Sequence, residues 1–380
     1  KVVIANNYEG IPHKDRSIWV NTRKLYEFFS RLNNIPVVGK KMFDMFDKFQ
    51  SIPDFYPYRD LSRPSMQVNQ LYSLIKKGWG KHFVDYLNQK DIPLITTFFT
   101  IAFMAEYHGF KNKIYLVVCD ADMSRAWVAQ DPKKSKINYL APCRRVVSRL
   151  KLYGVPDKHI FLSGFPLPDE NLGGVQLKTL KKDLAERIVN LDPEKRYREK
   201  YSATIKNFLK THIKINAKHT HPLTVTFAVG GAGAQANLGR QILKSLSPKL
   251  RKNELNFNLV AGSRVDVFNY FNTTLKELGL SRLLKKNISI IYDEDKEVYF
   301  KKFNEALRTT DILWTKPSEL SFYTALGMPI IMAPTIGSQE KYNRDWLIGV
   351  GGGLRQRNPE FTHQWLFDWV NSGWLAEAAM

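Results

Sequence analysis

A glycine-rich segment in the second half of the chain has the composition of a phosphate-binding loop. Gly230, Gly231 and Gly233 follow the apolar run 223–229 and precede a stretch compatible with a helix. Glycines at such a turn let backbone N–H groups approach phosphate oxygens, and the following helix offers its positive N-terminus to the same group. The spacing therefore predicts a diphosphate site directly after residue 229.

Two polar clusters further along could bind the rest of such a ligand. Ser318 and Glu319 lie in the segment 315–321, after a predicted strand, and the segment 337–343 follows the next strand. In open α/β sheets, the loops at the carboxyl ends of the strands bind ligands. The second segment supplies two amides and a carboxylate, from Gln339, Asn343 and Glu340. Hydroxyl, carboxylate and amide groups are the directed hydrogen-bonding partners that a ribose and a sugar ring need.

Two other interpretations of the glycine-rich segment remain open. The pattern Gly-x-Gly-x-x-Ala at 231–236 matches the fingerprint of dinucleotide-binding enzymes, which would make the protein NAD-dependent. That fingerprint expects an acid at the end of the next strand, where this chain has Ala-Gly-Ser-Arg and no carboxylate until Asp266. A strand-to-helix turn without a ligand is the second alternative. Arg264 would either neutralise phosphate charge or remain a solvated loop residue.

Short apolar runs alternate with helix-compatible stretches along the chain, as in α/β proteins. After a β-rich run at 1–5, strands are expected at 92–99, 114–119, 137–140, 160–163, 223–229, 256–261, 288–292, 312–314 and 329–332. The charged segments 177–191 and 193–211 interrupt the alternation. The expected organisation is an N-terminal domain at 1–168, a helical insertion or linker at 169–218, a C-terminal domain at 219–360 and a last helix at 361–380. We expect that helix to pack back on the N-terminal domain.

The net charge is high and unevenly distributed. Of the 380 residues, 57 are Lys or Arg and 36 are Asp or Glu, which gives +21. Residues 1–220 hold 38 basic and 21 acidic side chains, a net of +17, whereas residues 221–380 hold 19 and 15, a net of +4. The asymmetry suggests that the first half meets nucleic acid or an anionic membrane surface, or else that it is a solubilising surface.

The cysteine content and the apolar stretches exclude several classes of protein. Cys119 and Cys143 are the only cysteines, which argues against a disulfide scaffold and favours a reducing compartment. The longest nearly apolar stretch, 92–105, is too short and too rich in threonine to span a bilayer. No secretory signal opens the chain. We therefore expect a cytoplasmic protein.

In combination, these motifs resemble a known family of enzymes. The segments that carry the likeness are 118–127, 139–142, 149–154, 160–166, 226–233, 311–329, 337–343 and 349–353. Together they resemble the GT-B glycosyltransferases, most closely family 28, which contains the peptidoglycan N-acetylglucosaminyltransferase and monogalactosyldiacylglycerol synthase. The likeness covers about residues 90–167 and 222–380. It implies the GT-B fold, with two Rossmann-like doubly wound domains and a cleft between them.

The resemblance also implies roles for the polar clusters. The diphosphate of a nucleotide-sugar, most often a UDP-sugar, would lie at Gly230 to Gly233, and Glu319 would bind its ribose. Gln339, Glu340 and Asn343 would contact the donor sugar, and the base would lie near 291–292. Family members invert the anomeric carbon and use neither a metal nor a cofactor. Their acceptors are often lipids.

The catalytic base is the part of the family pattern that this chain lacks. The family's early strand, with a glycine-rich loop and a histidine, should precede the equivalent of residues 1–5. Asp120 and Asp122, after the strand 114–119, are the substitutes, and His13 and His108 are lesser candidates. Asp120-Ala-Asp122 also matches the metal-binding Asp-x-Asp of GT-A enzymes. A GT-A fold, however, leaves the second sheet and its glycine-rich loop unexplained.

A lipid acceptor would explain the basic first half better than nucleic acid does. Aromatic residues at 43–49 and 55–58 and Trp79 lie near lysines, as at a membrane interface. The alternative is an ordinary helix that buries Met42, Met45, Phe46 and Phe49 in the core. We expect peripheral association with the inner face of the membrane and no nucleic-acid partner. Two alternatives to the transferase are a nucleotide-sugar 2-epimerase of GT-B fold and a nucleic-acid-binding protein.

Overall fold

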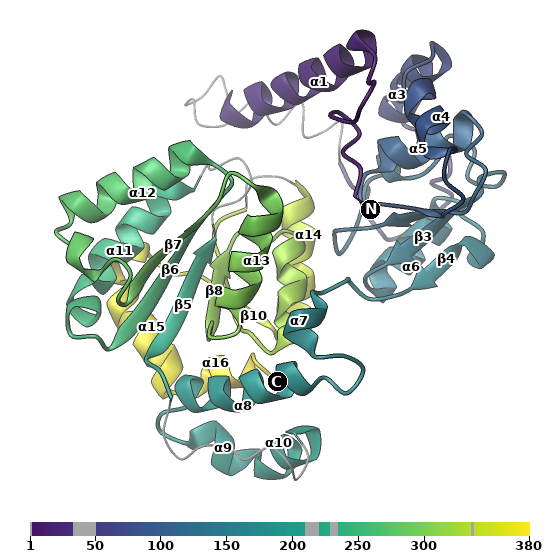
Figure 1. Ribbon diagram of the computed structural model, residues 1–380. Helices are drawn as coiled ribbons and strands as arrows, with labels where there is room; N and C mark the ends of the chain where they lie inside the picture. The colour runs from purple at the N-terminus through teal and green to yellow at the C-terminus, as the bar shows by residue number, and fades with distance from the viewer. Residues whose placement is uncertain (1, 33–50, 210–219, 229–234, 336–337) are drawn as a thin grey trace. The chain divides into compact units, whose positions relative to one another are not determined.

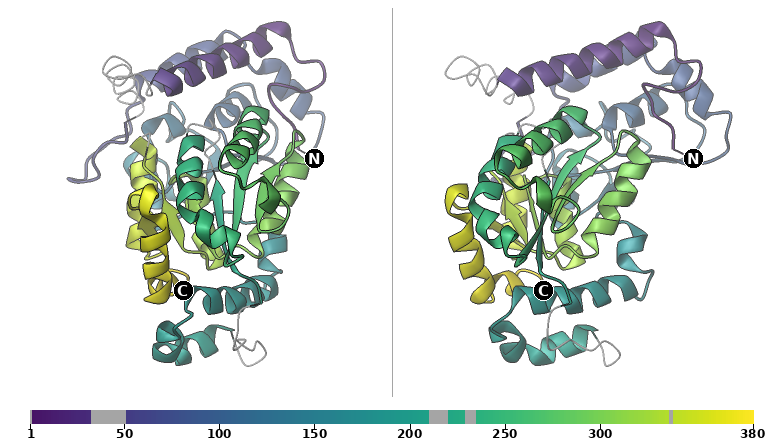
Figure 2. Two further views of the ribbon diagram at one scale, coloured as in Figure 1. Left: turned by 90° about the vertical axis from the view of Figure 1, so that its left-hand side faces the viewer. Right: turned by 60° about the vertical axis from the view of Figure 1, so that its left-hand side comes forward.

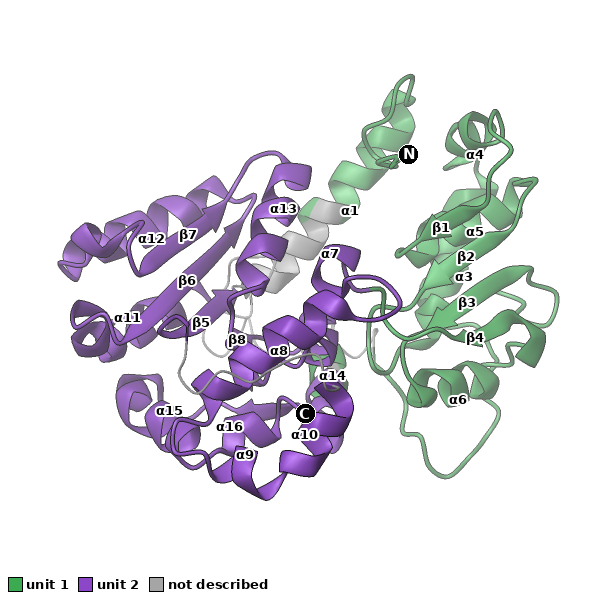
Figure 3. Ribbon diagram, turned by 60° about the horizontal axis from the view of Figure 1, so that its bottom comes forward, with its two compact units in different colours: residues 1–166, 337–342 green, residues 167–336, 343–380 purple. Residues whose placement is uncertain are grey.

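The computed structural model describes residues 2–32, 51–209, 220–228, 235–335 and 338–380 (Figure 1). The chain forms two compact units, one from residues 1–166 and 337–342 and the other from residues 167–336 and 343–380 (Figure 3). Each unit contains a parallel sheet with helical connections. The predicted α/β class with two Rossmann-like units is therefore confirmed.

The sheet of the first unit has four described strands in the order of the sequence. They are β1 (Leu94–Thr96), β2 (Ile114–Val117), β3 (Ile137–Ala141) and β4 (Ile160–Leu162). The helices α5 (Phe99–Tyr107) and α6 (Arg144–Leu152) connect neighbouring strands. Because the described order contains no reversal, this sheet is wound in one direction only. The doubly wound form expected for this domain is not seen in the described residues.

Three further helices belong to the first unit: α1 (His13–Leu32), α3 (Met66–Lys76) and α4 (Lys81–Leu87). A buried hydrogen bond of 3.2 Å from the Gly80 amide to the Asp15 carboxylate joins the first turn of α1 to the start of α4. The β-rich run that opens the chain forms no strand over residues 2–5. The aromatic segment 43–49 and its alternative core residues lie outside the described residues, whereas Trp79 is buried in the core.

The sheet of the second unit has six described strands in the order β10-β9-β8-β5-β6-β7. Their bounds are β5 (Leu223–Ala228), β6 (Leu255–Gly262), β7 (Ile288–Tyr292), β8 (Ile312–Thr315), β9 (Ile330–Met332) and β10 (Gly353–Arg355). The chain winds outward from β5 to β7, returns to the other side of β5 and continues to β10. The direction of winding reverses between β5 and β8, so this sheet is doubly wound.

Helices cover both faces of the second sheet. Leu313 and Trp314 are neighbours on β8 and therefore point to opposite faces. Trp314 contacts Trp365 of α15 (Thr362–Asn371), which packs on α11 (Ala236–Arg251). Leu313 packs in a cluster with Leu347 of α14 (Ser338–Gly349). Figure 2 shows α15 and the short α16 (Trp374–Glu377), in yellow, on one side of this sheet.

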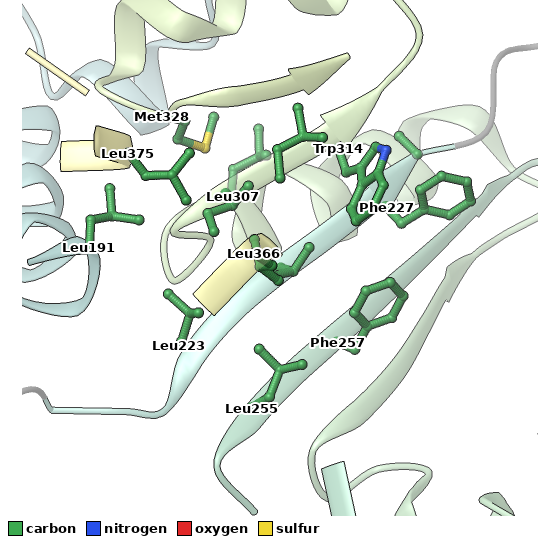
Figure 4. Packing of buried hydrophobic residues seen from close by; sticks show 14 of the residues in the cluster. Leu191, Leu223, Phe227, Leu255, Phe257, Leu307, Trp314, Met328, Leu366 and Leu375 are labelled. Carbon is green, nitrogen blue, oxygen red and sulfur yellow. The ribbon is translucent and has the colours of Figure 1, made fainter. Parts of the chain in front are cut away.

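The core of the second unit is built from large side chains of the strands (Figure 4). Phe227, Phe257 and Trp314 are completely buried, and burial of each such side chain contributes about 1.5–3 kcal/mol. Gly239 lets α11 approach β5, because a Cβ atom at this position would lie 2.9 Å from the Phe227 ring. The glycine thus brings the N-terminal part of α11 close to the strand that precedes it.

The segment expected to be a linker is part of the second unit. It contains α7 (Asp169–Leu172), α8 (Lys178–Leu191), α9 (Arg196–Lys200) and α10 (Ser202–Leu209). Arg187 of α8 is buried and donates to the carbonyl oxygens of Thr310 (2.7 Å) and Leu326 (2.7 Å). These bonds satisfy backbone groups at the ends of α13 (Lys296–Leu307) and η4 (Glu319–Leu326). The segment is therefore fixed to the second unit by buried contacts.

The C-terminal helices α15 and α16 pack on α8 of the second unit, and α15 also packs on α11. Their packing on the N-terminal domain stays a prediction. The charge is also shared more evenly than the sequence halves suggested. The first unit holds 27 Lys and Arg against 15 Asp and Glu, a net of +12, and the second holds 30 against 21, a net of +9. The basic helices after residue 166 account for the change.

Candidate functional site

The carboxyl edge of the second sheet lies where the winding of the chain reverses, between β5 and β8. The chain leaves β5 at Ala228 and enters α11 at Ala236, beside the reversal of the winding. Gly230, Gly231 and Gly233 lie between these elements and outside the described residues. α11 has 16 residues, so its N-terminus carries the positive end of a full helix dipole. An anion placed after β5 would meet that end.

Two hydroxyl groups at this edge are buried without a partner. Thr315 ends β8 and Ser321 lies in η4, and neither hydroxyl oxygen has a hydrogen-bond partner among the described residues. Leaving a buried polar group unpaired costs about 1–3 kcal/mol. Both residues belong to the predicted polar cluster 315–321, but the sequence singled out their neighbours. A polar ligand at this edge would satisfy them.

Ser318 and Glu319 lie at the start of η4, where Ser318 is the N-cap residue. Ser318 is half-buried and Glu319 is exposed. Burial raises the pKa of Tyr323 to about 12, and the negative charge of Glu319 acts in the same direction. Glu319 and Tyr323 both belong to η4. The two predicted residues thus flank Thr315 and Ser321 in the sequence and in the fold.

Arg264 is occupied by an acidic neighbour. It is the N-cap residue of α12 (Val265–Glu277), and its guanidinium pairs with the Asp266 carboxylate at 2.7 and 3.1 Å. This hydrogen bonding lowers the pKa of Asp266 below its ordinary value. Both interpretations of Arg264, as a phosphate-neutralising group and as a solvated loop residue, stay predictions. At the end of β7, near the position expected for the base, the Tyr292 ring stacks on Phe268 with 4.5 Å between centroids.

The residues predicted to contact the donor sugar lie on α14, which begins in the first unit and continues into the second. Gln339 is half-buried and Glu340 is buried, and both belong to the part in the first unit. Asn343 belongs to the second unit, is completely buried and donates to the Pro317 carbonyl oxygen at 3.4 Å. The structure therefore brings Asn343 to the Thr315–Ser318 turn.

The carboxyl edge of the first sheet carries a buried carboxylate held by two arginines. Asp122 follows β2 and accepts hydrogen bonds from Arg149 (2.8 and 2.9 Å) and from Arg145 (2.9 Å). Burial by itself would lower the pKa of Arg149, but hydrogen bonding to Asp122 and its charge raise it above the ordinary value. The Arg145 guanidinium also lies 3.7 Å from the centre of the Phe55 ring. Neither arginine was predicted, because nothing in the sequence distinguishes them from the many solvated ones.

This arrangement separates the candidate bases. Asp122 is 1% exposed and both of its oxygens face guanidinium groups, so it is poorly placed to take a proton from a substrate. Asp120 is half-buried in the same loop. His13 is the exposed first residue of α1. His108 follows α5, and its Nε2 donates to the Trp79 carbonyl oxygen at 3.0 Å, at the opposite edge of the sheet.

The described residues contain neither a cluster of metal-binding side chains nor a helix that could span a membrane. They contain no group of three or more His, Cys, Asp or Glu side chains that could hold a metal ion. Within the same part of the chain, no helix is both long and apolar enough to cross a membrane.

A family model described as a domain of unknown function (DUF6938) matches residues 203–354. The matched region runs from α10 to β10 and includes the whole doubly wound sheet. A comparison with curated proteins gives no match.

One similar solved structure is a putative UDP-N-acetylglucosamine 2-epimerase from Listeria monocytogenes, with 13% sequence identity and a TM-score of 0.45. The match covers 85% of this chain and 76% of the epimerase chain. Acinetobacter baumannii MurG has 13% identity and a TM-score of 0.42, over 89% and 82%. The UDP-GlcNAc 2-epimerase from Neisseria meningitidis has 10% identity and a TM-score of 0.42, over 90% and 87%. With TM-scores below 0.5, these likenesses add nothing to the fold and the edges described above.

Proposed function

We propose that this protein transfers a sugar from a nucleotide-sugar, with UDP as the expected nucleotide, to a lipid or other amphiphilic acceptor. The observation that carries the proposal is the strand order of the second unit, in which the winding reverses between β5 and β8. Doubly wound sheets bind nucleotides at such a reversal. In this chain the connection that leaves β5 there is the glycine-rich segment.

The residues of the second unit would hold the donor. Backbone amides after β5 and the N-terminus of α11 would bind the diphosphate, and the dipole would stabilise its charge. Glu319 would accept hydrogen bonds from the ribose. The unpaired hydroxyls of Thr315 and Ser321 would bond to the ligand beside Asn343. The proposal places Gln339 and Glu340 at the donor sugar and uses no metal and no cofactor.

The reaction would be a single displacement at the anomeric carbon. The acceptor oxygen forms the new bond to this carbon while the bond to the diphosphate oxygen breaks, and the diphosphate leaves with the electron pair. The configuration inverts because attack and departure occur on opposite faces. Asp120 would take the proton of the acceptor hydroxyl. It is preferred to Asp122, whose oxygens are bonded to Arg145 and Arg149.

The same strand order occurs in NAD-dependent enzymes, and the end of β6 distinguishes the two. In dinucleotide-binding sheets an acid at this position binds the ribose. Here β6 ends at Gly262 and is followed by Ser263 and Arg264, which is paired with Asp266. This argues for a nucleotide-sugar in place of NAD. A 2-epimerase remains a second activity that would use the same donor.

A panel of nucleotides tests the proposal directly. Purified protein is heated with UDP, GDP, dTDP, UDP-sugars or NAD, each with and without EDTA. UDP is expected to raise Tm in both conditions, since a ligand at 100 times its Kd stabilises the native state by about 2.7 kcal/mol. Absence of a shift with every nucleoside diphosphate would overturn the proposal. Conversion of a UDP-sugar without an acceptor would identify an epimerase.

A matched pair of exposed glutamates tests the site itself. Glu319 lies in the first turn of η4, and Glu360 lies in the first turn of η5 (Pro359–Phe361), another 3-10 helix of the same unit. Glu319→Gln is expected to weaken UDP binding about tenfold through the lost charge-assisted bond to the ribose. Glu360→Gln should leave the affinity, measured by calorimetry, unchanged. Glu340→Ala is expected to abolish transfer, provided that its melting curve shows a folded protein.

A further inference from the structure

A cavity of about 610 Å³ lies beside β1 in the first unit. Its walls come from four elements and the N-terminal segment, and include Trp19 of α1, Phe83 of α4, Ile95 of β1 and Ile101 of α5. It extends from residues before β1, such as Ile92, to residues after it. All of these belong to one compact unit. The cavity is therefore built by the first unit alone.

The lining is almost entirely apolar. Its side chains are aliphatic or aromatic except for Asn6, Lys90 and Thr96, and Lys90 is its only charged residue. Cavities of 300–1,000 Å³ with such linings usually bind the apolar parts of ligands. The cavity is unlike the two carboxyl edges, which are lined by charged and hydroxylic groups.

The rim of the cavity exposes large apolar side chains to solvent. Val2 is 82% exposed, Ile92 50%, Ile95 65% and Phe98 45%. β1 is also the edge strand of the sheet in the described part of the chain. Contiguous exposed apolar groups of this kind mark sites of contact with a partner or a membrane.

Three lysines lie near the start of β1, on the side of Ile92, which precedes this strand. Lys90 lines the cavity, the Lys111 amide donates to the Asn88 side chain at 3.0 Å, and the Lys113 carbonyl oxygen accepts from the Leu94 amide at 2.9 Å. All three lysine side chains are exposed. Asp91 is the exposed acid beside them, so cations remain in excess.

We propose that this face of the first unit binds an anionic lipid bilayer, with one acyl chain in the cavity and anionic headgroups at Lys90, Lys111 and Lys113. The apolar rim would enter the interface, and each lysine near the anionic surface would attract it. A peptide strand or a second copy would suit the edge of β1 but would not require a band of lysines. The proposal deepens the proposed function by assigning its membrane contact to this face, whereas the sequence had suggested residues 43–58.

Flotation with vesicles tests this assignment without any substrate. The full chain is mixed with vesicles of phosphatidylcholine alone or with added phosphatidylglycerol, at low and high salt. Binding is expected only with the anionic lipid, weakened but not abolished by salt because the apolar contact persists. Absence of flotation with anionic vesicles at low salt would overturn the proposal.

The two edge strands of this sheet provide matched variants. Ile95 on β1 and Leu162 on β4 are both exposed, and Lys90 and Lys158 both precede their strands. Ile95→Glu is expected to reduce vesicle binding at least tenfold, and Lys90→Glu about tenfold at low salt but little at high salt. Leu162→Glu and Lys158→Glu should each change it less than twofold. Equal losses at the two edges would overturn the assignment.

Two further readouts separate this proposal from its alternatives. UDP should raise the Tm of Ile95→Glu as it does that of the parent protein. Vesicle binding without a UDP shift would refute the proposed donor and leave the membrane face standing, and the reverse result would do the opposite. A concentration-dependent dimer in light scattering that Ile95→Glu dissociates would show that a second copy covers β1, and would overturn the membrane assignment.

Discussion

Asp122 in the first unit and Asp311 in the second are each 1% exposed, but the two units supply them with different partners. Asp122 accepts from the guanidinium groups of Arg145 and Arg149. Asp311 accepts from the Thr224 amide and the Asn190 side chain, both at 2.8 Å, while Arg187 bonds to backbone carbonyl groups nearby. Asp122 is thus matched with two charged groups, whereas the bonds that Asp311 accepts come from neutral donors.

The partners of a buried carboxylate determine how far burial can raise its pKa. Burial raises the pKa of Asp311 from its ordinary value to about 6, although His221, the Thr224 amide and Arg187 act against the shift. The same contrast extends to hydroxyl groups. Tyr342 in the first unit donates to the Ile52 carbonyl oxygen at 3.1 Å, whereas Thr315 and Ser321 in the second have no partner among the described residues. Because Thr315 and Ser321 lie at the carboxyl edge of the second sheet, their unpaired hydroxyls suggest that this edge is built for a ligand.

The largest effect is expected from removing the paired carboxylate of the first unit. Asp122→Ala leaves the buried Arg149 guanidinium without its counter-charge and should lower the free energy of unfolding by about 3–5 kcal/mol. Urea denaturation measures the change. Asp157→Ala, which breaks an exposed pair with Lys151, should cost less than about 1 kcal/mol. Equal losses of unfolding free energy in the two variants would show that the buried ion pair contributes no more to stability than the exposed one.

The pH dependence of stability should reveal the weakly paired carboxylate of the second unit. Because the pKa of Asp311 is higher in the native state, this group stabilises the fold below its unfolded value of 3.8, and the contribution disappears as the pH rises through about 6. The difference amounts to roughly 3 kcal/mol. Urea denaturation between these pH values should show a steeper fall for the parent protein than for Asp311→Asn. Parallel curves would contradict the assignment.

Removing an unpaired hydroxyl should affect binding more than stability. Thr315→Val deletes a buried hydroxyl that has no described partner, so the free energy of unfolding should stay constant or rise by about 1 kcal/mol. UDP affinity should fall about tenfold. The control is Thr310→Val, which loses bonds of 2.7 and 2.8 Å to Thr226 and Ala306 and should cost about 1–2 kcal/mol. A destabilised Thr315→Val would show that its hydroxyl already has a structural partner.

The smallest effect concerns the paired hydroxyl of the first unit. Tyr342→Phe removes one hydrogen bond to the Ile52 carbonyl oxygen and should cost about 1 kcal/mol in thermal unfolding. Tyr107→Phe, at an exposed tyrosine of the same unit, should cost less than about 0.5 kcal/mol. No difference between the two variants would mean that the first turn of α14 contributes little to the first unit.

Most of the fold could be predicted because its signals are local. Apolar runs gave all the described strands except β10, whose sequence Gly-Leu-Arg has no strand-like alternation and which forms by pairing with β9. The helix α11 continues past Pro248 to Arg251, where packing on α15 outweighs the local preference. The boundary between the units was harder to predict, because α8 is rich in charged residues although one of its faces is buried.

The candidate site was predictable only in outline. The polar cluster 315–321 and the carboxylates after β2 lie at carboxyl edges, as the alternation of strands and helices requires. Which member of each cluster is buried or paired depends on distant residues, so Arg149 and Thr315 were missed. The roles of the predicted site residues remain predictions that the experiments above address.

The division of α14 between the two units has a consequence for synthesis on the ribosome. The first unit consists of residues 1–166 and 337–342, so its last part is translated after most of the second unit. The hydrogen bond between Tyr342 and Ile52 can form only after residue 342 has left the exit tunnel of the ribosome. During translation the N-terminal segment therefore stays without this contact while the six-stranded sheet is still being made. A chain released early, before residue 337, would lack part of both units.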